Sequence, residues 1–218
     1  MRGMKILSTN VAVPQADPGG ADRVSGIDKK PRECIRVFTP GPSYGDGSGV
    51  ESDVIGDTKH HGGAEKAVYA FAREELDYWQ ELLGRELPPG VFGENLTTTG
   101  VDWSAQLINQ RMRIGTAVLE VSISRQPCRT FASWLEQRGW VKRFADHGDC
   151  GAYLRVIEPG DIRPGDSIEL FDAPTHALTM RTLFAANMGD REAMAAVLEA
   201  DCVAPMYRER FEKMLRSQ

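Results

Sequence analysis

Apolar and polar residues alternate over short stretches between residues 4 and 171, with the period typical of β-strands. Between these stretches lie Gly-Asp and Pro-Gly turns, and the Gly-, Pro- and Ser-rich stretch 40–49 is predicted to be a loop. The alanine content of AVYAFA (67–72) leaves a helix open as the alternative to a strand there. Strands are predicted at 4–13, 67–72, 111–115, 117–124, 152–160 and 166–171.

Two segments within this β-rich region show helical spacing instead. In 73–84 (REELDYWQELLG) the apolar residues Leu76, Trp79, Leu82 and Leu83 recur at helical intervals. Gly84 suits the position just past a helix end. In 131–139 (FASWLEQRG) the large apolar residues also share one face. Short strands separated by turns favour a barrel or sandwich over a doubly wound sheet.

The pattern becomes helical after residue 172. The segments 178–190, 191–201 and 205–217 each carry a helical apolar period, with Asp190 suited to an N-cap and Pro205 to a first helical position. We therefore predict an α+β protein, with a β-rich domain at 1–172 and a small three-helix unit at 173–218. The apolar faces of these helices are narrow, so we expect them to pack on the body rather than fold alone.

Composition narrows the classes of partner. The chain has 218 residues, 41% of them hydrophobic and 26% charged, with a net charge of −5. An acidic balance argues against a nucleic-acid partner, and the longest apolar runs are too short for a membrane span. The first fifteen residues lack the layout of a signal peptide, so a cytoplasmic location is expected.

The four cysteines, at 34, 128, 150 and 202, form no CxxC pair and have no zinc-finger spacing with histidine. A disulfide framework is not expected in a cytoplasmic chain of this size. Cys128 stands apart, because Arg125 and Arg129 flank it just after the predicted strand 117–124. Nearby cations favour a thiolate. The alternative is a buried cysteine beside two surface arginines.

Three further motifs add basic groups to this picture. TKHHGGAEKAV (58–68) places His61 and Lys66 beside a Gly-Gly pair, GIDKKP (26–31) places a lysine pair before proline, and GVFGENLTTTG (90–100) brackets the amide of Asn95 with glycines. Each motif alone also fits an ordinary loop or turn. Together they form a local cationic set in an acidic protein, which suits an anionic ligand such as a phosphorylated cofactor. The set is Lys29, Lys30, Lys59, His61, Lys66, Arg125 and Arg129.

Taken in order, these motifs resemble the MOSC family, named after the C-terminal domain of molybdenum cofactor sulfurase, and its YiiM-like branch. The resemblance rests on GIDKKP, the run DTKHHGGxxKAVYA, GVFGENLTT, the block ending in RQPC, and GAYLRV. The segment from about Leu178 is similar to the three-helix unit of that branch. The resemblance covers nearly the whole chain and implies a β-rich MOSC barrel with peripheral helices.

The resemblance also implies a cofactor and an activity. MOSC domains bind the molybdenum cofactor (Mo-molybdopterin), a pterin dithiolene with a terminal phosphate, and Cys128 would be both the metal ligand and the catalytic residue. YiiM-like proteins reduce N-hydroxylated compounds, including hydroxylaminopurine bases, to amines. The chain has no flavin or nicotinamide fingerprint and no iron–sulfur cysteine cluster, so a separate protein would supply the electrons. The implied cofactor-binding residues are Lys30, His61, Lys66, Asn95, Arg125 and Arg129.

The chain departs from the family pattern near the thiol. The block commonly reads QPRxPC, whereas Ile123 and Ser124 precede Arg125 here, and relatives often carry a basic residue where this chain has Asp149 followed by Cys150. Two functions stay open. One is an N-hydroxyl reductase that depends on molybdenum; the other is a carrier that binds the cofactor, or carries sulfur on Cys128, without turnover of its own.

Overall fold

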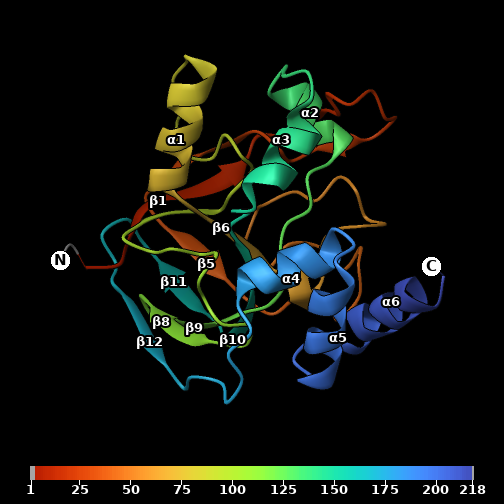
Figure 1. Cartoon of the computed structure of the whole chain (residues 1–218). Helices are drawn as coiled ribbons and strands as arrows, with labels where there is room; N and C mark the ends of the chain where they lie inside the picture. The colour runs from red at the N-terminus through yellow and green to blue at the C-terminus, as the bar shows by residue number, and fades with distance from the viewer. Residues whose placement is uncertain (1–2, 218) are drawn as a thin grey trace.

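A single curled sheet forms the body of the protein in the computed structural model, which describes residues 3–217. Figure 1 shows the sheet with helices arranged around it. The strand order is β12-β8-β9-β10-β6-β7-β1-β4, and of these neighbours only β6 and β7 run parallel. The six segments predicted to be strands each contain a strand of this sheet. The strands are β1 (Lys5–Ala12), β4 (Lys29–Arg32), β6 (Val68–Ala72), β7 (Leu96–Thr99), β8 (Arg111–Ile114), β9 (Ala117–Val121), β10 (Ala152–Glu158) and β12 (Ile168–Phe171).

The sheet curls until β1 meets the segment that leads into β12. Lys5 and Ser167 form an antiparallel bridge, and the Ile6 amide donates to the Asp166 carbonyl at 2.9 Å. This contact joins β1, the strand next to one end of the sheet, to the segment before β12 at the other end, and so brings the two sides of the half-barrel together. The predicted α+β class with a barrel-type sheet is confirmed.

Shorter strands form two small sheets of their own. The strands β2 (Gln15–Ala16) and β3 (Val24–Ser25) form one small hairpin, and β5 (Ile35–Val37) pairs with β11 (Gly160–Ile162). The 3₁₀ turn η1 (Ala64–Lys66) precedes β6 directly. No helix in the described range 3–217 has the length and apolar character needed to cross a lipid bilayer.

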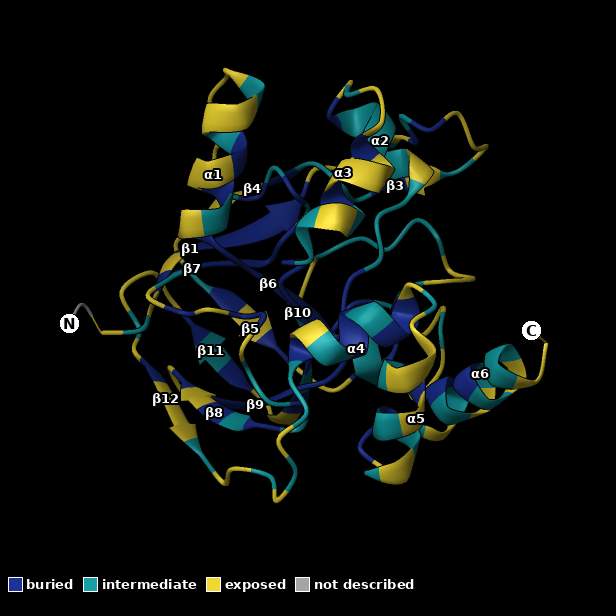
Figure 2. Ribbon diagram, viewed as in Figure 1, coloured by how far each residue is buried: buried dark blue, intermediate teal, exposed yellow. Residues whose placement is uncertain are grey.

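Three helices lie over one end of the half-barrel, and their aromatic side chains pack together there in one cluster. They are α1 (Arg73–Leu83), α2 (Arg129–Trp134) and α3 (Trp140–His147). The ring centroids of Trp79 and Trp140 lie 4.7 Å apart, and those of Phe92 and Phe131 lie 4.9 Å apart. Figure 2 shows buried positions on β1, β6 and β10 and exposed ones on the outer face of α1. The helix α2 packs into this cluster through Phe131.

The tail consists of α4 (Met180–Asn187), α5 (Arg191–Glu199) and α6 (Pro205–Arg216). The predicted caps are confirmed: the Asp190 carboxylate accepts from the Ala193 amide at 2.9 Å, and Pro205 opens α6. The tail is joined to the body by backbone bonds, including Met180 N–H to the Gln106 carbonyl at 2.8 Å. The division into domains at 1–172 and 173–218 stays a prediction.

The segment around the thiol differs from the sequence expectation. The predicted strand 117–124 ends as β9 at Val121, because Ser122 and Ile123 both bond to Tyr153 and so form a β-bulge. The bulge bends the chain out of the sheet. The predicted helix 131–139 instead begins at Arg129 and ends at Trp134, and α3 follows it although the sequence analysis did not predict it.

Candidate functional site

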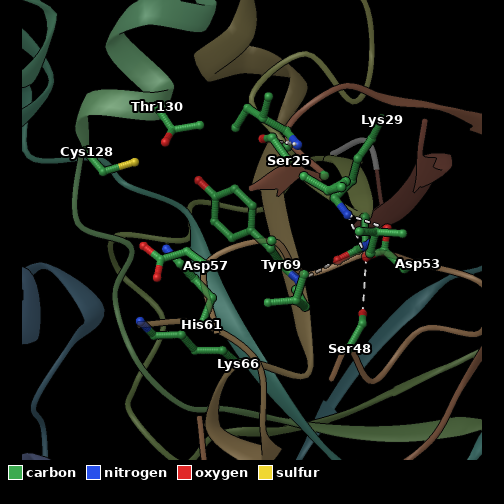
Figure 3. A pocket seen from close by; sticks show the side chains of 18 of the residues that line it. Ser25, Lys29, Ser48, Asp53, Asp57, His61, Lys66, Tyr69, Cys128 and Thr130 are labelled. Atoms are coloured by element: carbon green, nitrogen blue, oxygen red, sulfur yellow. Dashed lines mark hydrogen bonds and ion pairs between the residues drawn. The ribbon is translucent and has the colours of Figure 1, made fainter. Parts of the chain in front are cut away.

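A pocket opens where the β-bulge segment, the 48–69 loops and the β3–β4 connection meet (Figure 3). It holds about 740 Å³ of space, a volume that includes open solvent at its mouth. Cys128 lies on one side of Tyr69, and the Lys29–Asp53 pair lies on the other. The lining residues fall in the ranges 17–29, 48–69, 93–95 and 125–130, together with Tyr153.

Cys128 lines this pocket as a half-buried thiol. It was expected just after the predicted strand 117–124, but β9 ends earlier, at Val121, and Cys128 is the residue immediately before α2, with extended backbone at φ −134°. The bulge and Pro127 carry the chain from β9 to this point. The thiol is therefore presented by a bent connection rather than by the sheet edge.

Arg125 lies in the pocket wall and is only 5% exposed. Its guanidinium lies 4.0 Å from the ring centroid of Phe131 and 4.9 Å from that of Tyr69, and it donates to the Phe92 carbonyl. None of the ion pairs within residues 3–217 includes it. A buried charge without a counter-charge is costly, so an anion in the pocket would be stabilised by it.

Lys66 and His61 line the same pocket. The Lys66 ammonium donates to the His60 carbonyl at 2.7 Å and lies over the rings of Tyr44 and Tyr153, at 4.8 and 5.4 Å from their centroids. Burial and the charge of Arg210 lower the pKa of Lys66 to about 8. At neutral pH it is a cation that has no carboxylate partner in the part of the chain that the structure describes.

His61 contributes a neutral ring. Its Nδ1 lies 3.3 Å from the Tyr153 hydroxyl. Burial, followed by the charges of Lys66 and Arg125, lowers the pKa of His61 to about 3. An uncharged imidazole can donate or accept a hydrogen bond, but it adds no positive charge to the pocket.

Asn95 also lines the pocket, but its amide is already engaged. Its Nδ2 donates to Asp53 at 2.9 Å and to the Asn10 carbonyl at 3.2 Å, and its oxygen accepts from the Tyr69 amide at 3.1 Å. Both donor hydrogens are therefore used within the protein. The geometry suits a residue that holds the pocket wall more than one that binds a ligand.

Two predicted cofactor residues lie away from the pocket lining. Lys30 is exposed and pairs with Asp28 at 2.8 Å, and Arg129 is exposed at the start of α2. Lys29 takes the inward place expected for Lys30, because neighbouring residues of a strand point to opposite faces. The GIDKKP motif thus reaches the pocket through its first lysine.

The Lys29–Asp53 pair closes the end of the pocket opposite Cys128. The Asp53 carboxylate also accepts from the Ala12 amide at 2.8 Å and from the Ser48 hydroxyl at 3.1 Å. Although burial opposes ionisation, the charge and hydrogen bonds of Lys29 and the bond from Asn95 hold the pKa of Asp53 below its ordinary value. Asp53 was not predicted as a site residue.

A second ion-pair network lies at the rim beside Cys128. Arg23 contacts Asp17 at 2.6 Å and Asp57 at 2.8 Å, and the Thr130 hydroxyl donates to Asp17 at 3.0 Å. Thr130 lies in the first turn of α2, so the network anchors the helix that follows the thiol. Its residues were not predicted, because their contacts join segments far apart in the sequence.

The two residues that depart from the family pattern near GAY lie outside the pocket lining. Cys150 is 1% exposed, and burial raises the pKa of its thiol. Burial and the charge of Glu75 raise the pKa of Asp149 to about 6. Neither side chain is placed to contact a ligand beside Cys128.

Known proteins match this chain over most of its length. The model of the MOSC domain matches residues 57–169. The uncharacterized protein YflK of Bacillus subtilis is 31% identical over 193 residues, which are 88% of this chain and 84% of that protein. A protein named "Reductase" from Gibberella moniliformis is 32% identical over 142 residues, 62% of this chain but only 24% of that protein.

The fold has a solved counterpart. The crystal structure of YiiM from Geobacillus stearothermophilus superposes with a TM-score of 0.78 at 28% identity, covering 97% of this chain and 99% of that one. The family model covers the pocket residues from Asp57 to Tyr153, whereas the lining residues at 17–29 and 48–56 precede the matched range. The chain belongs to the MOSC domain family.

Proposed function

We propose that this protein binds the molybdenum cofactor in the pocket beside Cys128 and reduces N-hydroxylated compounds of the hydroxylaminopurine type to amines. MOSC domains are associated with the molybdenum cofactor, and a more distant homologue carries the name reductase. A separate electron-donor protein would supply the electrons. The cofactor-binding mode and the roles of single residues in this proposal rest on the residues of the pocket.

The observation that carries the proposal is the pairing of Arg125 with Cys128 in one pocket. The Arg125 guanidinium is buried without a carboxylate partner among the described residues, and Lys66 is likewise unpaired there. A terminal phosphate would supply the missing negative charge. A thiol is a soft ligand and suits a metal that is already bound by sulfur. The two cations of the pocket therefore fit the phosphate of the cofactor, and the thiol fits its metal.

Each residue has a defined place in this proposal. Cys128 would ligate the metal, while Arg125 and Lys66 would hold the phosphate and pterin, with His61 offering a neutral hydrogen-bonding ring. When bound, the molybdenum cofactor supplies a centre that exchanges two electrons. The overall reaction balances as R–NHOH + 2 e⁻ + 2 H⁺ → R–NH₂ + H₂O, so the pocket has to admit protons as well as substrate.

The test begins with protein made in a host that synthesises the cofactor. Metal analysis and pterin fluorescence should show bound molybdenum and pterin, and protein from a host unable to make the cofactor is the control. Reduced benzyl viologen replaces the unknown donor, and chromatography detects the amine formed from a hydroxylaminopurine base. The absence of bound cofactor would overturn the whole proposal. Bound cofactor without amine formation would favour the carrier function instead.

A further inference from the structure

The segment that carries Cys128 has few backbone anchors of its own. After the β-bulge at Ser122 and Ile123, residues 124–127 take part in no backbone–backbone hydrogen bond within the described chain, and α2 begins only at Arg129. Pro127 has no amide hydrogen to donate. Side chains must therefore hold this segment in place.

On the outer side, the tail helices provide those side-chain bonds. Asn187, the last residue of α4, donates from Nδ2 to the Ser124 hydroxyl at 2.8 Å. Its carbonyl accepts from Nε2 of Gln126 at 2.9 Å. Nη1 of Arg210 on α6 donates to the other end of the same amide, Oε1 of Gln126, at 3.2 Å. Gln126 thus joins two tail helices at a point two residues before the thiol.

The same helix reaches the opposite wall of the pocket. Tyr207 lies one turn before Arg210 on α6, and its hydroxyl lies 2.7 Å from the hydroxyl of Tyr44. The Tyr44 ring in turn lies beneath the Lys66 ammonium. One face of α6 therefore contacts both the segment that leads to Cys128 and the residues that surround Lys66.

We infer that the tail helices position Cys128, and that Gln126 and Arg210 are the positioning residues for its thiol. The tail is then part of the functional site, although it contributes no residue to the pocket lining. Loss of the Gln126–Arg210 bond frees the segment 124–128 on its outer side. The thiol then reaches solvent more often.

The test uses the full chain without cofactor, so its result does not depend on the proposed activity. Iodoacetamide alkylation is followed for each cysteine by mass spectrometry at one neutral pH. Gln126→Ala and Arg210→Ala should each raise the alkylation rate of Cys128 several-fold. The double variant should be no faster than the faster single one, because both remove the same bond. Arg210→Lys keeps a donor and should stay near the parent rate.

Two controls distinguish a specific effect on the position of Cys128 from a general loss of packing in the protein. Arg208→Ala removes another α6 arginine, which contacts Asp201 instead, and should leave the Cys128 rate unchanged. The rate at Cys34, which is half-buried outside the pocket lining, serves as the internal reference. Unchanged Cys128 rates in folded Gln126→Ala and Arg210→Ala, additive effects in the double variant, or an equal rise in Arg208→Ala would overturn the inference.

Discussion

Lys29 and Asp53 form a buried ion pair 2.5 Å across, with side chains 6% and 1% exposed. The pair joins β4 to the loop that precedes η1 and, through the Asp53 bonds to Ala12 and Asn95, to β1 and the start of β7. Because every oxygen of Asp53 already has partners, its place in the pocket wall is that of a support. The pocket end opposite the thiol is therefore held together by bonds within the protein itself.

Asp53→Ala should lower the free energy of unfolding by about 3–5 kcal/mol, because Lys29 is left buried without a partner. Urea unfolding followed by circular dichroism measures the change. Asp146→Ala is the matched control: it breaks the exposed pair with Lys142 and should cost less than about 1 kcal/mol. Equal costs for the two variants would show that the buried pair is not a structural support.

Cys128→Ser should keep much of the pterin and lose amine formation. The basic contacts of the pocket remain in this variant, whereas a hydroxyl is a poor substitute for thiolate on a metal bound by sulfur. Bound pterin and viologen-driven reduction are measured together, with Cys34→Ser as the control thiol. Full activity in Cys128→Ser would end the reductase proposal and leave a binding role.

Arg125→Ala should lower cofactor affinity by about 1–3 kcal/mol, the range for a lost charge-assisted bond. The variant also removes the contacts with the Tyr69 and Phe131 rings, so folding is checked by its thermal midpoint. Arg138→Ala, which changes an exposed arginine outside the pocket lining, is the control. Parent-level molybdenum and pterin in folded Arg125→Ala would remove this residue from the proposed site.

Cofactor retention should fall as the pH rises through the range where Lys66 loses its proton. The pKa of Lys66, lowered to about 8 by burial and the charge of Arg210, places this loss between pH 7 and 9, and a bound anion moves it upward. Gel filtration at pH 7 and pH 9, followed by metal analysis, measures retention. Lys66→Arg keeps its charge and should remove the pH dependence. A parent-like dependence in Lys66→Arg would point to another group.

Asp149→Asn should stabilise the protein at pH 8 and have no such effect at pH 4. Burial and Glu75 raise the pKa of Asp149 to about 6 from its ordinary 3.8, so the folded state holds the proton more tightly than the unfolded state. The cost of the ionised form therefore develops as the pH rises from about 4 to 6 and is fully present above pH 6, at about 1–3 kcal/mol. Asparagine keeps an oxygen to accept the Gly151 amide. Thermal midpoints at the two pH values test this; equal gains at both would contradict it.

Local pattern was enough to predict most elements of the fold. The predicted strands correspond to β1, β6, β8, β9, β10 and β12, whereas β4, β7 and the shorter strands were not predicted. The caps at Gly84, Asp190 and Pro205 were each confirmed. The strand 67–72 is β6, so its alanines did not make it a helix. These features depend on residues that lie close together in the chain, so they can be recognised from a short stretch of sequence.

Features that depend on a distant partner could not be predicted. Whether Lys29 or Lys30 faces the pocket depends on the register in which β4 pairs with β1, where Lys29 lies opposite Ala12. The bulge that bends the chain before Cys128 depends on Tyr153 across the sheet. The bonds of Gln126 to α4 and α6 likewise join residues that no local pattern relates.

The bridge between Lys5 and Ser167 has a consequence for synthesis of the chain. Ribosomes add about 5–20 residues per second, so roughly 10–30 s separate the appearance of Lys5 from that of Ser167. Throughout that interval the edge of β1 that will meet the β12 segment has unsatisfied backbone donors and acceptors, which are a template for unwanted strand addition. The nascent protein is thus most prone to aggregation until its final strand has left the ribosome.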